Sequence, residues 1–169
     1  MAAYYDIFAC NFCPVLVAVN EEGAVLRVDF LPGLETGWTP GGPGWCEQPV
    51  PDRRKTAAAR TQLEEYFAGK RRVFTLPLAV SGTKFQRRVW DELRRIPYGE
   101  TLTYAQVAAR IGQPAACRAV GRANGANRIP VLIPCHRVIG ARGDLTGFAG
   151  GLPLKRFLLR LEGIDLSMA

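Results

Sequence analysis

The residues with the clearest potential for chemistry are a neighbouring cysteine and histidine, Cys135 and His136, inside the apolar stretch 129–140. The two prolines of this stretch predict a buried but irregular extended segment, because proline cannot donate to a central strand ladder. His136 is the only histidine of the chain, so a zinc site built on several histidines is excluded. A thiolate is a strong nucleophile and imidazole is a base near neutral pH, so the pair is typical of nucleophilic catalysis.

A structural interpretation of the same pair stays open. Buried free cysteine is mostly an inert small hydrophobe, and a lone histidine is more often a structural residue. Neighbouring residues of a regular strand point to opposite faces. Cys135 and His136 could therefore pair directly only in a turn, or otherwise through a bridging water.

A carboxylate near the end of the chain is a candidate third member. Glu162 continues the apolar stripe of a predicted final helix. The stripe consists of Leu154, Phe157, Leu158 and Leu161. An inward-facing Glu162 could support a relay from the cysteine through water and His136, which would produce a thiolate at neutral pH. Gly163 is placed to end the helix, however, so spacing alone favours a frayed and solvated Glu162.

Helices of the second half must position these residues. The apolar spacing from Phe85 to Ile96 predicts a helix that stops at 97–99. Thr103 can cap a short helix from Tyr104 to Arg110, and a turn at 112–114 leads to another helix from about Ala115 to Asn124. The last two form a helix-turn-helix pattern, whose second member would be the recognition helix.

The predicted recognition helix has an unusual composition. Ala115, Ala119 and Ala123 lie four apart on one face, and Arg118 and Arg122 lie four apart on a neighbouring face. Small side chains let a helix approach a groove wall, and two stacked arginines can meet phosphates or fill a vacated base position. A solvated basic face beside tight helix packing explains the pattern equally well.

The first half reads as a small α/β domain. Apolar runs at 15–19 and 24–30 around a turn predict a hairpin, and residues 57–67 predict a helix ended by Gly69. Between them, the segment 31–52 contains five prolines and five glycines and is expected to be an irregular loop. One more strand is predicted at 73–80. The fold class is therefore α/β (α+β), with an N-terminal α/β domain at 1–80 and a mainly helical, winged helix-turn-helix-like domain at 81–169.

Charge separates the two halves. The 169 residues carry 22 Lys and Arg against 15 Asp and Glu, a net charge of +7. Residues 1–80 hold 8 basic and 9 acidic side chains (net −1), and residues 81–169 hold 14 and 6 (net +8). The second half is therefore the candidate nucleic-acid-binding half.

The cysteine pattern and the lack of a long apolar run favour a protein of the cytoplasm, which is a reducing compartment. No apolar run approaches the ~20 residues needed to span a bilayer, and a cytoplasmic protein is expected. Five cysteines do not resemble a secreted disulfide framework. Cys10 and Cys13 form a single CxxC with Cys46 as a distant third thiol, a pattern that favours free thiols over a metal site.

Several motifs together match a known family. Pro134-Cys135-His136-Arg137-Val138, preceded by Asn127 and followed by the segment GFAGG at 147–151, closely resembles the O6-alkylguanine-DNA alkyltransferases. The resemblance runs from about Thr83 to Gly163. It also includes Phe85-Gln86, Val89-Trp90, the segment IPYGET at 96–101, Tyr104, and the segment RAVG at 118–121. The first eighty residues fit the family only by position and general α/β character.

The resemblance implies direct reversal of DNA damage. Such proteins bind duplex DNA containing O6-alkylguanine, rotate the alkylated base out of the stack, and move its alkyl group irreversibly onto a cysteine. Cys135 would be the acceptor, His136 and Glu162 would activate it through water, and Asn127 would orient the relay or the base. No cofactor or metal is implied, and a monomer is expected, with association along DNA left open.

Further positions are carried over to DNA binding. Tyr104 and Arg118 match the base-rotating tyrosine and the intercalating arginine of the family. Sites of main-chain contact with the DNA backbone are matched by Gln86, Ala105, Gln113 and Ala141. Phe148-Ala149 stand where certain relatives have Tyr-Ser, which leaves the preference between methyl and bulkier groups open. Cys117 is expected to be a packing residue, or a second thiol near DNA.

Three other functions compete with repair. A lesion-binding sensor of the same fold would lack the acceptor thiol, so Cys135 argues against it. A winged-helix regulator explains the basic helices but leaves the PCHR motif, Pro134-Cys135-His136-Arg137, unexplained. A hydrolase built on the cysteine–histidine pair lacks the other members of a recognisable site.

Overall fold

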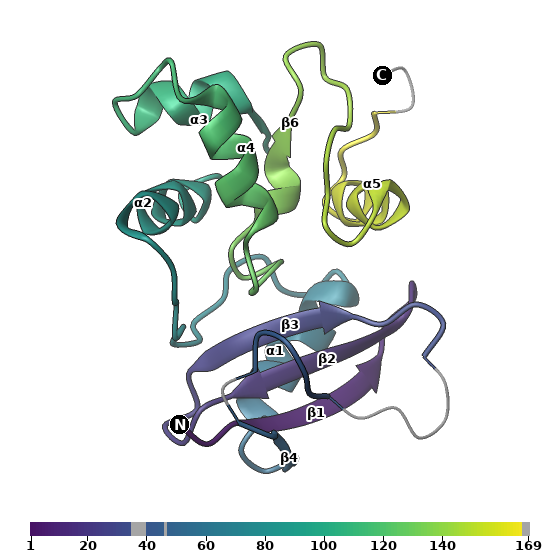
Figure 1. Ribbon diagram of the computed structural model, residues 1–169. Coiled ribbons are helices and arrows are strands. Elements are labelled where there is room, and N and C mark those ends of the chain that lie inside the picture. Colours follow the sequence, from purple (N-terminus) through teal and green to yellow (C-terminus); the bar gives the residue numbers. More distant parts are fainter. Residues whose placement is uncertain (35–39, 46, 167–169) are drawn as a thin grey trace. The chain divides into compact units, whose positions relative to one another are not determined.

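The computed structural model describes residues 1–34, 40–45 and 47–166. These residues fall into two compact units, with the division between Val80 and Ser81. Figure 1 shows the elements of each unit. The first unit holds a sheet and one helix, and the second holds four α-helices with a two-stranded sheet. Each unit is described by itself.

The sheet of the first unit has the strand order β3-β2-β1-β4. Its strands are β1 (Tyr4–Ala9), β2 (Pro14–Val19), β3 (Val25–Phe30) and β4 (Val50–Pro51). β2 pairs antiparallel with β1 and β3, and β4 joins β1 in parallel. Residues 15–19 of β2 are completely buried, which explains their unbroken apolar character. The hairpin predicted from β2 and β3 is confirmed.

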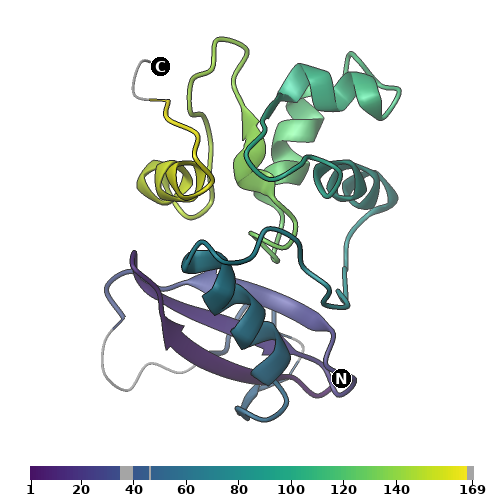
Figure 2. The ribbon, with the colours of Figure 1, turned by 180° about the vertical axis from the view of Figure 1, so that it is seen from behind.

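Helix α1 (Ala57–Phe67) covers one face of this sheet (Figure 2). It buries Ala59, Leu63, Tyr66 and Phe67, whose spacing places them on one stripe. Gly69, with φ of 73°, follows the end of the helix, as predicted. Phe67 packs edge-on against Phe30 of β3, with ring centroids 6.0 Å apart.

The strand predicted at 73–80 is wrong. Its one pairing among the described residues is an isolated parallel bridge between Leu78 and Val25. The Val25 N–H donates to Pro77 O and the Ala79 N–H donates to Val25 O, both at 2.8 Å. Pro77 itself has no N–H, and Val73 is 72% exposed, so neither pairing nor burial extends this bridge into a strand.

The N-terminal strand β1 and the short β4 were not predicted from the sequence. β4 lies within the segment expected to be a loop. Pro51, which has no N–H, is tolerated in this strand because β4 forms an edge of the sheet. Part of that segment, together with Cys46, lies outside the described residues. The expectation that Cys10, Cys13 and Cys46 bind no metal therefore stays a prediction.

The second unit begins with two capped helices. In α2 (Lys84–Leu93) the Thr83 side chain accepts from the Gln86 N–H, and the Gln86 side chain accepts from the Thr83 N–H. Thr103 and Gln106 form the same capping box on α3 (Tyr104–Arg110), as the sequence predicts for Thr103. These side chains satisfy N–H groups that a helix start leaves without a partner.

Helix α4 (Cys117–Gly125) completes the helix-turn-helix. It begins two residues later than expected, because Gln113–Ala116 form the turn after Gly112, whose φ is 77°. Ala115 is therefore outside the helix, and the predicted small-residue face is reduced to Ala119 and Ala123. The Trp90 indole of α2 donates to Ala123 O at 2.8 Å and fixes α4 against α2.

The remaining elements follow α4 in the chain, and β6 lies between α4 and α5 (Figure 1). A 3₁₀ turn, η1 (Cys135–Arg137), leads into β6 (Val138–Ile139), which pairs in parallel with β5 (Leu102–Thr103). Residues 140–151, here called the wing loop, connect β6 to α5 (Leu152–Leu161). Glu162 follows α5 directly as its C-terminal capping residue.

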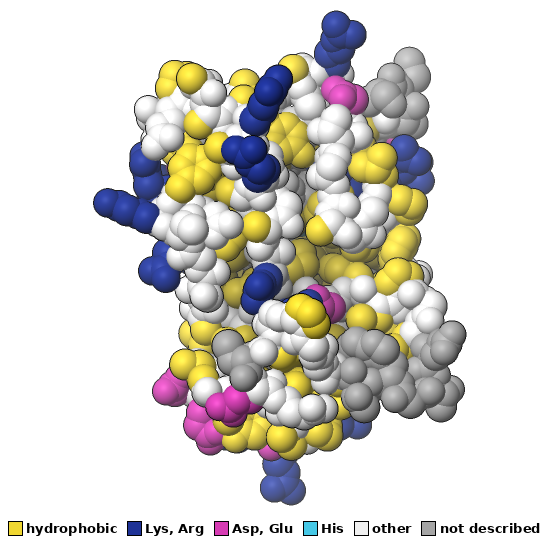
Figure 3. Space-filling model, in the orientation of Figure 1, with side chains coloured by type: hydrophobic (Ala, Val, Ile, Leu, Met, Phe, Trp, Pro, Cys, Tyr) yellow, Lys and Arg dark blue, Asp and Glu magenta, His cyan; other side chains and the backbone are white. Residues whose placement is uncertain are grey.

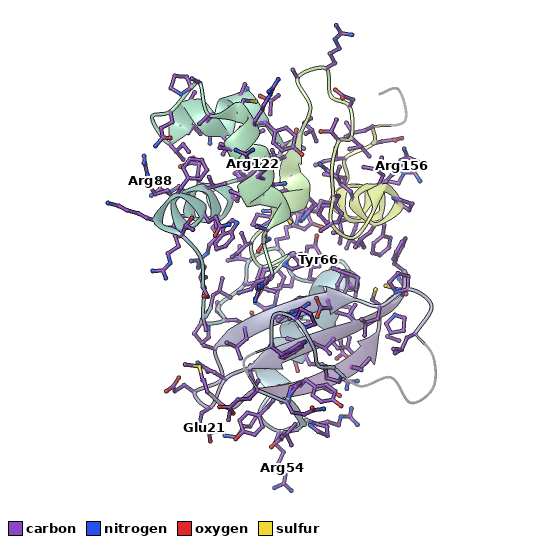
Figure 4. All side chains as sticks on the ribbon, in the orientation of Figure 1. Glu21, Arg54, Tyr66, Arg88, Arg122 and Arg156 are labelled. Atoms are coloured by element: carbon purple, nitrogen blue, oxygen red, sulfur yellow. The ribbon has the colours of Figure 1, made fainter. Side chains whose placement is uncertain are left out.

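On the face of the second unit shown in Figure 3, basic side chains gather over helices α2 and α4 and at the tip of the wing loop. Arg88 on α2, Arg122 on α4 and Arg156 on α5 are labelled in Figure 4, and all three are exposed. Among the described residues, no helix combines the length and the apolar character that crossing a bilayer requires.

Candidate active site

Cys135 and His136 lie in the 3₁₀ turn η1, which places both side chains in the interior. The turn follows Pro134, and it is closed by a hydrogen bond from the Arg137 N–H to Pro134 O at 3.0 Å. Cys135 is 4% exposed and His136 is completely buried. The predicted irregular segment therefore contains the turn that a close approach of neighbouring side chains requires.

His136 is hydrogen-bonded to Glu162. Its Nε2 lies 2.8 Å from Glu162 Oε1, and both side chains are fully buried. Since an ionised carboxylate only accepts hydrogen bonds, Nε2 carries the proton of the neutral imidazole. Nδ1 has no hydrogen-bond partner among the described residues. The lone pair of Nδ1 is thus available to accept a proton.

Glu162 is held in place by Arg137. Arg137 Nε donates to Oε2 at 2.9 Å, and its Nη2 donates to Oε1 at 2.8 Å. Arg137 Nη1 donates to Ile96 O at 2.6 Å, and the Gly99 N–H donates to Glu162 Oε2 at 3.2 Å. The carboxylate therefore connects the end of α5 to η1 and to the turn after α2.

The preference for a solvated Glu162 is wrong. Gly163 does end the helix, with φ of 83°, but the capping position still faces the interior. Burial raises the pKa of Glu162, and hydrogen bonds from His136 and Arg137 outweigh it and lower that pKa below its usual range. Arg137, adjacent to His136 in the sequence, was the signal for a buried carboxylate, because a buried guanidinium requires an anion.

The thiol and the imidazole have complementary protonation states. Burial raises the pKa of Cys135 to about 11, while the Asn127 side chain and the charge of Lys155 act in the opposite direction. Burial also lowers the pKa of His136, more than Glu162 raises it. At neutral pH a protonated thiol therefore accompanies a neutral imidazole, and the thiolate has to be formed by transfer of a proton.

Two asparagines support the turn. Asn127 Nδ2 donates to Ile133 O at 2.8 Å, and Asn127 Oδ1 accepts from the Ile129 N–H at 2.9 Å. Asn124 Nδ2 donates to Cys135 O at 3.3 Å from inside α4. Asn124 was missed in the sequence, although a polar residue at a buried helical position indicates such a contact.

The predicted DNA-contacting residues lie on separate elements of the helix-turn-helix unit. Tyr104 begins α3, and its hydroxyl donates to Thr146 O of the wing loop at 3.1 Å. Burial raises the pKa of Tyr104, so its hydroxyl is neutral. Arg118 is exposed on the first turn of α4. The structure thus connects Tyr104 with the wing loop and leaves the Arg118 side chain accessible.

The four positions expected to contact the DNA backbone lie at helix starts, in a turn and in a loop. Gln86 is in the first turn of α2, where its side chain caps the helix. Ala105 is exposed in the first turn of α3, Gln113 in the turn before α4, and Ala141 in the wing loop. Ala105, Gln113 and Ala141 are exposed, which suits contacts made by the main chain.

The buried stripe of α5 differs from the expected one. Leu154 and Leu158 are buried as predicted, whereas Phe157 and Leu161 are partly exposed. Leu159 and Lys155 are buried in addition. Lys155 was missed, because a lysine within an apolar pattern is normally assigned to the solvent side.

Replacement of Arg137 by methionine is expected to lower the free energy of unfolding by about 3–5 kcal/mol, because it leaves a buried carboxylate without its counter-charge. Arg95→Met is the matched control. Arg95 is also paired with a buried carboxylate, Glu92 at 3.2 Å, but its own side chain is 75% exposed. Its loss should cost less than about 1 kcal/mol. Equal destabilisation of both variants in urea denaturation would contradict the buried network.

The chain is similar to known proteins over most of its length. Residues 84–164 match a family model described as the DNA-binding domain of 6-O-methylguanine DNA methyltransferase. The methylated-DNA–protein-cysteine methyltransferase of Methanosarcina acetivorans is 49% identical over 160 residues, covering 95% of this chain and 98% of the relative. The constitutive enzyme of that name from Bacillus subtilis is 55% identical over 155 residues, covering 89% and 90%.

A solved structure extends the likeness to the fold. Mycobacterium tuberculosis OGT in complex with DNA superposes with a TM-score of 0.81 at 40% identity, covering 94% of this chain and 92% of that one. The structural similarity therefore includes the first eighty residues, which in sequence fit the family only by their position and general α/β character. The chain belongs to the methylated-DNA–protein-cysteine methyltransferase family.

Proposed function

We propose that this protein repairs O6-alkylguanine in duplex DNA by moving the alkyl group to the Cys135 sulfur, in a single irreversible turnover. One observation carries the proposal. His136, the residue directly after Cys135, is hydrogen-bonded through Nε2 to the buried Glu162, and its Nδ1 is left ready to accept a proton. The raised pKa of Cys135 makes this base necessary, because at neutral pH the sulfur is held as a thiol.

The proposed transfer balances without a cofactor. The thiol proton passes through a bridging water to His136 Nδ1, and the resulting imidazolium is stabilised by Glu162. A sulfur lone pair forms the bond to the alkyl carbon while the bond from that carbon to O6 breaks. The electron pair of the broken bond stays with the guanine, which takes up a proton from water, and the His136 imidazolium returns its proton to water, so the protons balance. The thioether product has no good leaving group, so the protein is consumed.

Arg137 and Asn127 act as positioning residues in this reaction. Arg137 keeps Glu162 ionised and fixes both carboxylate oxygens. Asn127 hydrogen-bonds the main chain at Ile129 and Ile133, and its side chain lowers the pKa of Cys135. These contacts hold the turn η1 in the geometry that proton transfer requires.

The target base must leave the DNA stack to react. A sulfur that is almost completely buried cannot reach a base inside a duplex, whereas an extruded nucleotide can enter the protein. We assign the rotation of the nucleotide to Tyr104, at the start of α3, and the filling of the vacated space to Arg118 on α4. The positive charge of the second unit supports binding of the phosphate backbone.

Replacement of Arg118 by alanine should weaken repair of duplex DNA by about tenfold or more, because unstacking costs a few kcal/mol and Arg118 offsets it. Reaction with a free O6-alkylguanine base should change far less, since no stack has to be opened. Arg122→Ala, which removes the same charge one turn later on α4, controls for loss of phosphate attraction. Equal loss on the two substrates for Arg118→Ala would exclude the role in extrusion.

The same proposal covers the partners and the compartment. Main-chain groups at Gln86, Ala105, Gln113 and Ala141 would contact phosphates and fix the register on the duplex. The protein would act as a monomer, with neighbouring molecules able to associate along DNA. A nucleophilic thiol has to stay reduced, which supports a cytoplasmic location.

Identification of the alkylated residue tests the proposal. The protein is incubated with a duplex containing one O6-methylguanine, digested, and analysed by mass spectrometry. We expect one added methyl group on the peptide that contains Cys135, and none on those containing Cys10, Cys13 or Cys117. Methylation of another cysteine, or lesion binding without any methylated peptide, would overturn the proposal, and the second result would favour a lesion sensor.

A further inference from the structure

The turn between β1 and β2 carries two free cysteines, Cys10 and Cys13, which the proposed function does not use. Ala9 and Pro14 are the last paired residues of the two strands. Cys10 and Cys13 are therefore the next residues to face each other, and only residues 11–12 lie between them. The Cys10 N–H donates to Cys13 O at 3.3 Å, which closes the turn and keeps the two residues opposite each other.

This arrangement meets the geometric requirement of a disulfide bond. Residues that face each other across an antiparallel pair have Cα atoms about 4.5–5.5 Å apart and side chains on the same face of the sheet. Disulfides in proteins join residues whose Cα atoms are about 4.4–6.8 Å apart. The Cys10 side chain already points towards its neighbour, since the thiol donates to Cys13 O at 3.1 Å. The hairpin therefore holds two thiols in positions from which an S–S bond can form.

The two thiols differ in their access to solvent. Cys10 is half-buried, whereas Cys13 is 8% exposed. Burial raises the pKa of Cys13, a hydrogen bond from the Leu31 main chain opposes that effect, and negative charge on Cys10 adds to it. A reagent from solution therefore reaches the Cys10 sulfur first. The Cys13 sulfur is protected from the reagent but lies beside the residue that reacts.

We propose that Cys10 and Cys13 form a redox-active pair, which reacts with small-molecule disulfides such as oxidised glutathione and closes the hairpin with a reversible disulfide. The Cys10 thiolate attacks one sulfur of the reagent, forms a mixed disulfide and releases the first thiol. The Cys13 thiolate then attacks the Cys10 sulfur, forms the internal S–S bond and releases the second thiol. Two electrons pass from the pair to the reagent, and the two protons lost by the cysteines are balanced by those on the released thiols.

Cys117 offers a matched control within the same chain. It is an exposed cysteine at the start of α4, a helix that contains no second cysteine. The same reagent can form a mixed disulfide with it, but no neighbour on the helix can displace the glutathione. Cys135 is a second control, because its burial at 4% exposure and its raised pKa both slow attack on the reagent.

Peptide mapping after oxidation tests the inference. The first basic residue of the chain is Arg27, so one tryptic peptide, 1–27, contains both cysteines of the pair, and Cys117 and Cys135 fall in two other peptides. The protein is incubated with oxidised glutathione, free thiols are blocked with iodoacetamide, and the digest is analysed by mass spectrometry. We expect peptide 1–27 to lose two hydrogen atoms and to carry no glutathione, while Cys117 retains glutathione and Cys135 is recovered as a thiol.

The outcomes that would overturn the inference appear in the same digest. They are a lasting glutathione adduct on peptide 1–27, recovery of that peptide with both thiols blocked, and a bond from either cysteine to Cys46. Failure of the protein to accept a methyl group from DNA would overturn the proposed function instead, because oxidation of the hairpin involves neither DNA nor Cys135.

Two variants test the order of attack. Cys13→Ser removes the thiol that resolves the mixed disulfide, so peptide 1–27 should retain glutathione on Cys10. In Cys10→Ser only the buried thiol remains, and uptake of glutathione by this peptide should be slower by about tenfold or more. Uptake at the same rate in both variants would contradict the assignment of Cys10 as the first thiol to react.

Unfolding in concentrated urea separates the geometry of the hairpin from mere closeness in the sequence. The ratio of internal to mixed disulfide in peptide 1–27 should be higher in the folded protein by about tenfold or more, because the fold holds the two sulfur atoms side by side. The same ratio in folded and unfolded protein would show that the hairpin contributes nothing, and would overturn the inference.

Discussion

Replacement of Cys135 by serine is expected to abolish methyl transfer while leaving the fold and the binding of DNA intact. Serine fits the buried turn η1, since its hydroxyl is smaller than a thiol. A hydroxyl is far harder to ionise and far less nucleophilic than a thiol, so the rate should drop by more than about 10³-fold. Methyl transfer is measured by protein mass, and binding by electrophoretic mobility shift with the same duplex.

Cys117→Ser is the matched control for this variant. Cys117 is exposed at the start of α4, and it precedes the arginine that we assign to base extrusion. Its replacement should leave the rate and the amount of transfer unchanged. Retention of transfer by Cys135→Ser, or its loss in Cys117→Ser, would show that the acceptor has been assigned to the wrong thiol.

The second large effect is expected for Glu162→Gln. Removal of the anion leaves the imidazolium of His136 without its stabilising charge. A glutamine amide can also donate to Nε2, which would move the imidazole proton to Nδ1 and remove the proton-accepting lone pair. General base catalysis is typically worth at least ~10²-fold, so the rate of transfer should fall by about that factor.

Stability has to be separated from chemistry in this variant, because Arg137 loses its counter-charge as well. The rate is therefore measured on protein shown to be folded by circular dichroism. Glu92→Gln is the control, since Glu92 is another buried carboxylate, paired with Arg95 and Arg110 of the same unit. It should destabilise the protein without changing the rate per folded molecule. An unchanged rate in folded Glu162→Gln would exclude the proposed relay.

The sequence predicts elements best where local chemistry defines their ends. Thr103 provides a side chain for the start of α3, and Gly69 provides the positive φ after α1, so both helices agree with prediction. The apolar run of β2 and the turn after it identify the hairpin. Such signals act within a few residues and do not depend on the tertiary structure.

Elements that depend on distant partners could not be predicted in this way. β4 consists of two residues that form a strand only because β1 lies beside them. The apolar segment 73–80 resembles a strand in composition, yet among the described residues its one β-bridge is at Leu78. Pairing across the chain decides both cases, and periodicity within a short segment does not contain that information.

Prediction of the site divides in the same way, between residues that a local motif identifies and residues that depend on tertiary contacts. The PCHR motif and its resemblance to the alkyltransferases indicate Cys135 and His136, and the family membership agrees with the prediction of direct repair. Burial of Glu162 and Lys155 could not be read from spacing, because both depend on charges that only the tertiary structure brings near. Charged residues at such positions are costly to bury, so prediction from sequence assigns them to solvent.

The most direct test of the central claim is the stoichiometry of transfer under excess substrate. A limiting amount of protein is mixed with an excess of duplex that carries a radiolabelled methyl group on the O6 atom of one guanine. We predict a single burst that ends with one label for each protein molecule, all of it bound at Cys135 and none released with time. Continued turnover beyond one equivalent, or label that never appears on the protein, would contradict the account.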